Sequence, residues 1–182
     1  MIDLVVRSIL PVALSMLPPA MDSTPARAML IAIGLQESKF LARRQIIKSG
    51  KPGPAAGFWQ FEQGGGVAGV LQHPRTRDLA LQVLRRLRYV KGPNPGRVIT
   101  STEIVHAKLE DNDVLACVFA RLLLWTVPGI LPKRHEEGAG WGQYIHGWRP
   151  GQPHRDTWAS YYAEAWERIE TAHGNLPGGE TL

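Results

Sequence analysis

The chain has 182 residues and a mass of 20.1 kDa, enough for one well-buried core but too little for two ordinary domains, so we expect a single domain over residues 1–182. Its 44% of hydrophobic residues and 20% of charged residues exclude a disordered chain. A formal net charge of +5 favours approach to a polyanion, but does not choose among nucleic acid, a membrane surface and an acidic cell wall. The lone Cys117 excludes an internal disulfide bond.

The amino-terminal segment is apolar but does not have the charge pattern of a signal peptide, because it places an acid at Asp3 and its first base only at Arg7. We expect a core helix over residues 3–17, ended by Pro18 and Pro19. No uninterrupted apolar run approaches the roughly 20 residues that cross a bilayer. The sequence therefore predicts no integral membrane segment and a protein made in the cytoplasm of its host.

Residues 25–41 are predicted to form the next helix, with Thr24 as its N-cap and Pro25 at its first position. This helix is apolar on nearly all sides between residues 29 and 35, which is typical of a central, buried element. Residues 48–69 hold seven Gly and two Pro, too many for a regular helix, so we expect a loop or a small irregular β element there.

The rest of the chain is predicted to be helical between loops, giving a mainly α fold class. Residues 76–90 have an amphipathic pattern, and Ser101 or Thr102 could cap a helix that runs to residue 109. Further helices are expected over residues 111–126 and 155–173, and we expect residues 175–182 to be a flexible tail.

Glu37 is the main candidate for a catalytic residue, because every other ionisable residue between Ser23 and Phe61 is basic. On a helix it shares a stripe with Ile33 and Leu30, so apolar neighbours partly surround its carboxyl group. Desolvation raises the pKa of such a group, which can then donate a proton near neutral pH, as glycosidases require.

The alternative for Glu37 is a residue at a helix end that only forms an ion pair with Lys39, Arg43 or Arg44.

The stretch GFWQFE, residues 57–62, favours the catalytic interpretation of Glu37. Trp59 and Phe61 could stack on sugar faces, and the Gln60 amide could bind a hydroxyl or acetamido group. The alternative is that Phe58 and Trp59 fill the core and that the glycines only permit tight turns.

A helix that ends in Glu37-Ser38, followed some twenty residues later by a Gly-aromatic-x-Gln element at Gly57 and Gln60, resembles the lysozyme-like fold of soluble lytic transglycosylases and related phage peptidoglycan hydrolases. The resemblance covers residues 25–130. It implies that Glu37 is the catalytic acid and base, that Ser38 helps to position it, and that Gln60 lines a cleft for peptidoglycan glycan strands. It implies no metal and no cofactor, and none of the six His has metal-ligand spacing.

The third element of that family, an Ala-Tyr-Asn stretch in a buried helix, has its nearest counterpart in Val118-Phe119-Ala120. Phe119 keeps the ring of the family's tyrosine but not its hydroxyl. Tyr144 and Trp148 are either aromatic residues of the cleft or packing residues.

Two reactions follow from the resemblance. A lytic transglycosylase uses one carboxyl group and forms 1,6-anhydro-muramyl products, whereas hydrolysing lysozymes usually add a second acid. Glu62 is either that second acid or a solvent-facing loop residue. We expect transglycosylase chemistry at the β-1,4 bond between N-acetylmuramic acid and N-acetylglucosamine, with Glu37 as acid and base.

Without a signal peptide, a lysis enzyme would need a holin, whereas a virion-carried enzyme is assembled in the cytoplasm and delivered at infection. We expect the second, with other virion or tail proteins as partners and action on the cell wall in the periplasm. A catalytically inactive virion protein of the same fold is an alternative. The arginines of residues 75–88 suggest a DNA-binding protein as a further alternative. Such a cluster of basic residues is more often the solvated face of a helix, so we do not expect nucleic acid as a partner.

Overall fold

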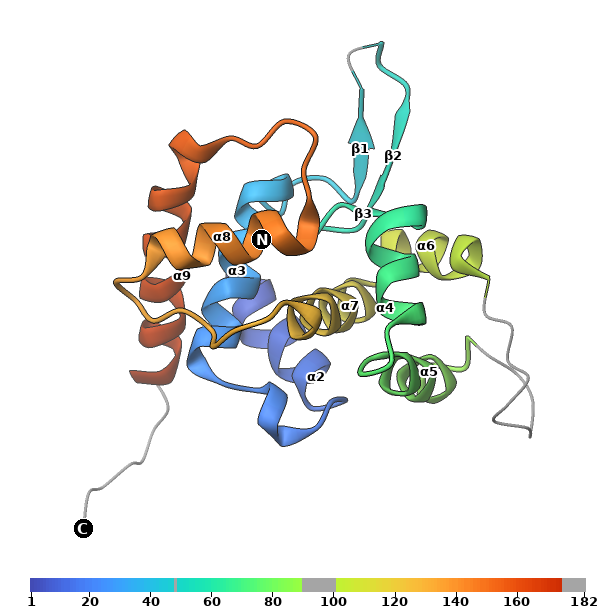
Figure 1. Cartoon of the computed structure of the whole chain (residues 1–182), viewed down its shortest axis with the longest axis horizontal. Helices are drawn as coiled ribbons and strands as arrows, with labels where there is room; N and C mark the ends of the chain where they lie inside the picture. The colour runs from blue at the N-terminus through green and yellow to red at the C-terminus, as the bar shows by residue number, and fades with distance from the viewer. Residues whose placement is uncertain (48, 90–100, 175–182) are drawn as a thin grey trace.

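The computed structural model describes residues 1–47, 49–89 and 101–174 (Figure 1). It is mainly helical, with a small three-stranded antiparallel sheet after the third helix, in agreement with the predicted fold class. Most of the buried apolar side chains in the described ranges belong to one hydrophobic cluster. The predicted flexible tail, residues 175–182, lies outside the described residues.

The amino-terminal helical segment consists of α1 (Ile2–Leu4), a π-helical segment η1 (Val5–Ile9) and α2 (Leu10–Leu14). It is followed by a short 3-10 helix, η2 (Pro19–Met21). Pro11 lies just after η1, where a widened turn accommodates a residue without an N–H. The segment therefore begins as predicted but ends three residues earlier than expected.

Helix α3 (Thr24–Ser38) is the central helix, and its residues from Ala28 to Leu35 are buried. Its N-cap is Ser23, whose hydroxyl accepts a hydrogen bond from the amide of Ala26 at 3.3 Å, so the prediction of Thr24 as N-cap is wrong. The helix ends at residue 38 rather than 41 because the next two residues, Lys39 and Phe40, have left-handed backbone φ angles of 53° and 56°.

The ring of Phe40 then folds back against Gly34, where a Cβ atom would lie 2.2 Å from the phenyl ring. Only glycine leaves room for this close contact, which returns the chain to the body of the protein just after the end of α3.

Three antiparallel strands follow α3 in the order β1 (Arg44–Ile46), β2 (Pro52–Ala56) and β3 (Phe61–Glu62). Ala56 lies opposite Arg44 on one side and opposite Phe61 on the other. The hairpin of β1 and β2 projects from the helical body (Figure 1). Of the two alternatives for this region, the β element is the one observed.

The glycine-rich stretch after β3, at the end of the region predicted to be a loop or a small β element, is instead helical. It forms a π-helical segment, η3 (Gln63–Val67), which continues into α4 (Ala68–Gln72). A Cβ on Gly66 would lie 2.6 Å from the ring of Phe61, so this glycine lets the segment pack directly against β3. Tertiary packing therefore outweighs the low helix propensity of glycine here.

Three helices follow at positions close to those predicted: α5 (Arg77–Arg86), α6 (Thr102–Asp111) and α7 (Asp113–Thr126). Ser101 caps α6 by accepting a hydrogen bond from the amide of Glu103. Helix α7 is almost entirely buried and includes the buried thiol of Cys117.

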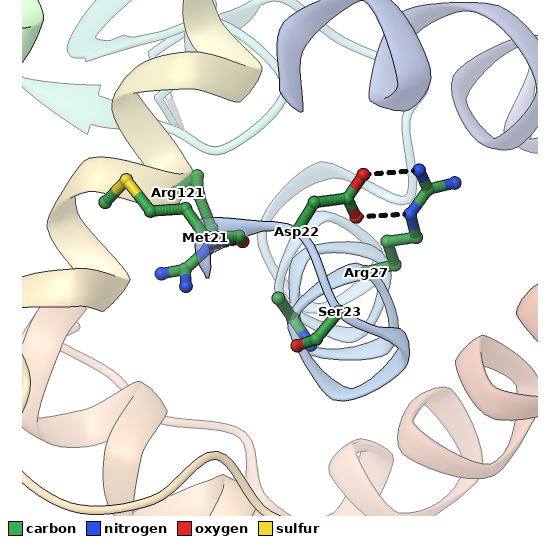
Figure 2. A network of polar contacts seen from close by, with 6 residues as sticks. Met21, Asp22, Ser23, Arg27 and Arg121 are labelled. Atoms are coloured by element: carbon green, nitrogen blue, oxygen red, sulfur yellow. Dashed lines mark hydrogen bonds and ion pairs between the residues drawn. The ribbon is translucent and has the colours of Figure 1, made fainter. Parts of the chain in front are cut away.

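A buried arginine joins α7 to the segment before α3. Arg121 has 1% of its surface exposed, and its Nε donates a hydrogen bond to the carbonyl of Met21 at 2.7 Å. Figure 2 shows this contact beside the ion pair of Asp22 and Arg27. The Arg121 contact holds the segment before α3 against α7, and the ion pair ties that segment to the first turn of α3.

The last two helices are α8 (Glu137–Trp148) and α9 (Arg155–Gly174), and α9 packs along α3 (Figure 1). Helix α9 was predicted, but α8 was not, because its four glycines lower helix propensity. One of them, Gly140, lies so close to Tyr162 that a Cβ would be 2.8 Å from its ring. This glycine allows α8 and α9 to pack closely.

None of the helices in the described ranges is long and apolar enough to cross a membrane.

Candidate active site

A pocket of about 630 Å³ lies where the end of α3, the small sheet and the end of α8 meet. Gln45 and Ala55 of the hairpin form one side, and residues 149–152 and His154, after α8, form another. The pocket is open to solvent and is lined by both polar and aromatic side chains, among them Glu37, Gln60, Phe61, Glu62, Tyr144 and Trp148.

Glu37 lies in the last turn of α3, and its carboxyl group is partly buried in the wall of the pocket. Burial raises its pKa from 4.5 to about 7, and the nearby charge of Glu62 acts in the same direction. A hydrogen bond from Tyr144 acts in the opposite direction. The result is a carboxyl group that can both donate and accept a proton near neutral pH.

The phenol of Tyr144 donates its hydrogen bond to Oε1 of Glu37 at 2.7 Å. Burial, followed by the charge of Glu37, raises the pKa of Tyr144, so this phenol stays protonated and acts as a donor. Its ring stacks on Trp158 of α9, with ring centroids 5.2 Å apart and an interplanar angle of 11°. Helices α8 and α9 therefore set the orientation of the carboxyl group on α3.

The ion-pairing alternative for Glu37 is not observed. Arg43 pairs with Asp113 at 2.7 Å, and Arg44 pairs with Glu110. Glu37 forms no ion pair with any residue in the described ranges. The basic residues that follow α3 instead fasten the start of the hairpin to α6 and α7.

Ser38 and Gly57 lie behind the pocket and shape it without lining it. The hydroxyl of Ser38 donates to the carbonyl of Phe58 at 2.7 Å and accepts a hydrogen bond from the amide of Phe40 at 3.1 Å. Gly57 has a φ of +73°, and a Cβ there would lie 2.8 Å from the carbonyl oxygen of Leu109. These contacts place the turn of residues 57–60 directly against the end of α3.

Gln60 and Glu62 both line the pocket. The Gln60 amide nitrogen donates to the carbonyl of Gly57 at 2.8 Å, which leaves its Oε1 as the atom with no hydrogen bond within the described chain. Glu62 lies on β3 with an exposed side chain. It is therefore both solvent-facing and close enough to influence the pKa of Glu37.

Trp59 and Phe119, two of the candidates for substrate binding, do not line the pocket. For Phe58 and Trp59, the alternative that they fill the core is the one observed. Each side chain is fully buried. The indole of Trp59 donates to the carbonyl of Leu30 at 2.8 Å, and the ring of Phe119 meets Phe61 edge to face, with centroids 6.3 Å apart. Both rings are packing residues of the core in this structure.

The structure shows pocket residues that the sequence analysis did not single out. They lie on a loop after α8 that forms one side of the pocket. Arg149, Gln152 and His154 belong to this loop, and Gln36 of α3 holds it. Pro150 and Gly151 indicate a loop in the sequence. No local pattern reveals that this loop meets the end of α3, more than a hundred residues earlier.

Within the described ranges, no group of three His, Cys, Asp or Glu side chains is arranged to hold a metal ion. Comparison of the chain with protein-family models, with curated proteins and with solved structures finds no match. The function is therefore inferred from the residues and from the geometry of this pocket.

Proposed function

We propose that this protein is a peptidoglycan-degrading enzyme with a lysozyme-like domain. It cleaves the β-1,4 bond between N-acetylmuramic acid and N-acetylglucosamine, with Glu37 as general acid and base. The observation that carries the proposal is the carboxyl group of Glu37, with a pKa of about 7, in the wall of an open pocket. A glycosidic oxygen is a poor leaving group until it is protonated, and such a carboxyl group can supply the proton.

The proposed reaction is that of a lytic transglycosylase. Protonated Glu37 gives its proton to the glycosidic oxygen as the bond from C1 of the muramyl residue to that oxygen breaks. The resulting carboxylate then takes the proton of the muramyl C6 hydroxyl, whose oxygen bonds to C1 and closes the 1,6-anhydro ring. The carboxyl group ends protonated, as it began, and no water is consumed.

The fold and the pocket support this proposal in two ways. A mainly helical domain with a small antiparallel sheet after the helix that carries the acid is the arrangement that the resemblance implies. The pocket also contains a phenol, that of Tyr144, although Phe119 lacks the hydroxyl of the family's tyrosine.

A hydrolytic lysozyme is the second candidate, and the position of Glu62 favours it. This carboxylate lines the same pocket as Glu37 and could act as nucleophile or as base for a water molecule. In that reaction water attacks C1, and the product has a reducing end instead of an anhydro ring.

Mass spectrometry of soluble fragments from purified peptidoglycan would test the proposal. The wild type should release anhydro-muramyl fragments, Glu37→Gln should release none, and Glu167→Gln should behave as the wild type because Glu167 is an exposed carboxylate on α9 outside the pocket. Reducing-end products that are lost in Glu62→Gln would establish hydrolysis. No fragments from folded wild type would contradict an enzyme and favour an inactive virion protein.

The resemblance to phage enzymes extends the proposal to a virion-associated protein that meets the cell wall during infection, with virion or tail proteins as partners. Detection of the chain in purified particles would test this part separately.

A further inference from the structure

The loop of residues 149–154 is held at both ends next to Glu37. At its start, the indole of Trp148 donates to the carbonyl of Trp59 at 3.0 Å. At its far end, the side-chain amide of Gln36 donates to the carbonyl of His154 at 2.9 Å. Because Gln36 immediately precedes Glu37 in α3, the position of the loop is coupled to that of the acid.

Arg149 is an unusual residue for its place in this loop. It ends α8 with left-handed backbone angles, φ 49° and ψ 51°, and its amide donates to the carbonyl of Ile145 at 3.1 Å. Glycine is the usual residue at such a helix end, because a side chain there is strained.

The guanidinium group of Arg149 is available to a ligand. The residue is exposed, lines the pocket and forms no ion pair with any residue of the described chain. Its Nε makes only a long contact of 3.4 Å with the carbonyl of His146. The five N–H donors of a guanidinium form a planar fork that matches a carboxylate.

The other charges in the pocket lining are acidic, which makes the Arg149 guanidinium the group that can attract an anionic ligand. Glu37 and Glu62 are the acidic residues of the lining, and Arg149 is its only lysine or arginine among the described residues. A ligand with a carboxylate would meet like charge from Glu62, and from Glu37 when it is ionised. Arg149 is the lining residue that offers it a fixed opposite charge.

We propose that Arg149 binds a carboxylate carried by the muramyl residue of the glycan, and thereby selects muramyl-containing strands over neutral chitin-like strands. The carboxylate belongs either to the lactyl group or to a peptide attached to it. This inference rests on the proposed function, because it assumes that the pocket binds a glycan.

The test uses the Glu37→Gln background, so that ligands remain uncut, and measures Kd by calorimetry. Three tetrasaccharides are compared: alternating N-acetylglucosamine and N-acetylmuramic acid with free lactyl carboxylates, the same with attached peptides, and neutral N-acetylglucosamine alone. Adding Arg149→Gln should weaken binding of one or both acidic ligands about tenfold and leave the neutral ligand unchanged. The matched control is Arg86→Gln, which removes the same charge from exposed α5 outside the pocket.

The outcomes separate the two proposals. If Arg149→Gln loses affinity only for the tetrasaccharide with free lactyl groups, Arg149 binds the lactyl carboxylate. If it loses affinity only for the tetrasaccharide with attached peptides, Arg149 binds a peptide carboxylate. Equal losses for all three ligands, or no loss for any in a folded variant, would overturn the role of Arg149 while leaving the glycan site intact. If Glu37→Gln alone binds none of the ligands, the proposed function fails together with this inference.

Discussion

Glu37 combines a catalytic use with a cost to stability. Its carboxyl group is partly desolvated, and the same desolvation that raises its pKa to about 7 penalises its ionised form in the folded state. Tyr144 reduces this penalty through its hydrogen bond, and Glu62 increases it. The balance of these three residues sets the pH at which the acid loses its proton.

Replacing Glu37 by glutamine should therefore stabilise the protein, and only at higher pH. The pKa of the folded state lies above the reference value of 4.5, so the wild type loses stability as pH rises from about 4.5 to about 7. At about 1.4 kcal/mol per unit, this loss approaches about 3 kcal/mol. Urea unfolding should show Glu37→Gln more stable than the wild type at pH 8 and nearly equal at pH 4.

Glu167→Gln is the matched control, because it makes the same change at an exposed site and should show no such dependence on pH. An equal stability difference at pH 4 and pH 8 for Glu37→Gln would show that the pKa of Glu37 is not raised.

Removing the hydroxyl of Tyr144 should shift the pH dependence of catalysis. Tyr144→Phe removes a hydrogen bond that stabilises the ionised carboxylate, so the pKa of Glu37 should rise further, by about one unit. Because the first step needs protonated Glu37, the alkaline limb of the kcat/KM profile should move to higher pH, while kcat falls as the carboxyl group loses its orientation.

The control for this change is Tyr161→Phe, since Tyr161 lies on α9 outside the pocket. An alkaline limb that stays in place in Tyr144→Phe would mean that this hydrogen bond does not influence the acid.

At the scale of elements, the site depends on how α3 ends. Lys39 and Phe40 turn the chain out of the helix, and Ser38 ties the helix end to the turn of residues 57–60. Gly57 allows this turn to approach the backbone of α6. The acid is therefore positioned by a junction of three elements and not by α3 alone.

A comparison of two glycines would isolate this close approach. Gly57 and Gly50 have similar left-handed φ angles of 73° and 77°, but only at Gly57 would a Cβ clash, 2.8 Å from the Leu109 carbonyl oxygen. Both Gly57→Ala and Gly50→Ala should lose about 1 kcal/mol from backbone strain. Gly57→Ala should lose roughly 1–3 kcal/mol more, since crowding in a packed region adds to the strain.

Chemical denaturation of both variants would check this, and kcat should fall in Gly57→Ala alone. Equal destabilisation of the two variants would show that the turn can move away from α6 without cost.

At the scale of the whole molecule, the positive charge is concentrated away from the pocket. Residues 75–88 hold five arginines and one aspartate, a formal charge of +4, compared with +5 for the chain. Most of these arginines are exposed on or beside α5. In the proposed function this surface would attract the enzyme to an anionic wall.

The rate at which the enzyme solubilises intact cell wall should therefore depend on the salt concentration. Between 50 and 300 mM salt, solubilisation of anionic peptidoglycan should slow several-fold, because screening shortens the range of attraction to about 10 Å or less. Cleavage of a short soluble tetrasaccharide should change little. The double variant Arg77→Gln with Arg86→Gln should show a weaker salt dependence on the wall and normal cleavage of the tetrasaccharide.

Equal salt dependence for the wall and the tetrasaccharide would show instead that the salt acts at the pocket.

The sequence was informative where a local pattern carries the signal. Gly and Pro positions and helical periodicity predicted most of the helices, and the stripe of Ile33 and Leu30 predicted the raised pKa of Glu37. Local sequence patterns failed to predict helices where tertiary packing outweighs the low helix propensity of glycine. At Gly66 of η3 and Gly140 of α8, neighbouring aromatic rings fill the space that a side chain would occupy, so close packing offsets the low helix propensity of glycine.

The amino-acid sequence by itself determined that the chain is mainly helical, that a glycine-rich break follows the helix that carries Glu37, and that this carboxylate is isolated at the end of that helix. Only the tertiary structure decided that Tyr144 contacts this carboxylate, that Trp59 and Phe119 are buried, and that Arg149 lines the pocket. The physical reason is that burial and hydrogen bonding at the pocket arise between residues more than a hundred positions apart, 107 for Tyr144 and Glu37 and 118 for His154 and Gln36. Periodicity and turn signals describe only neighbours along the chain.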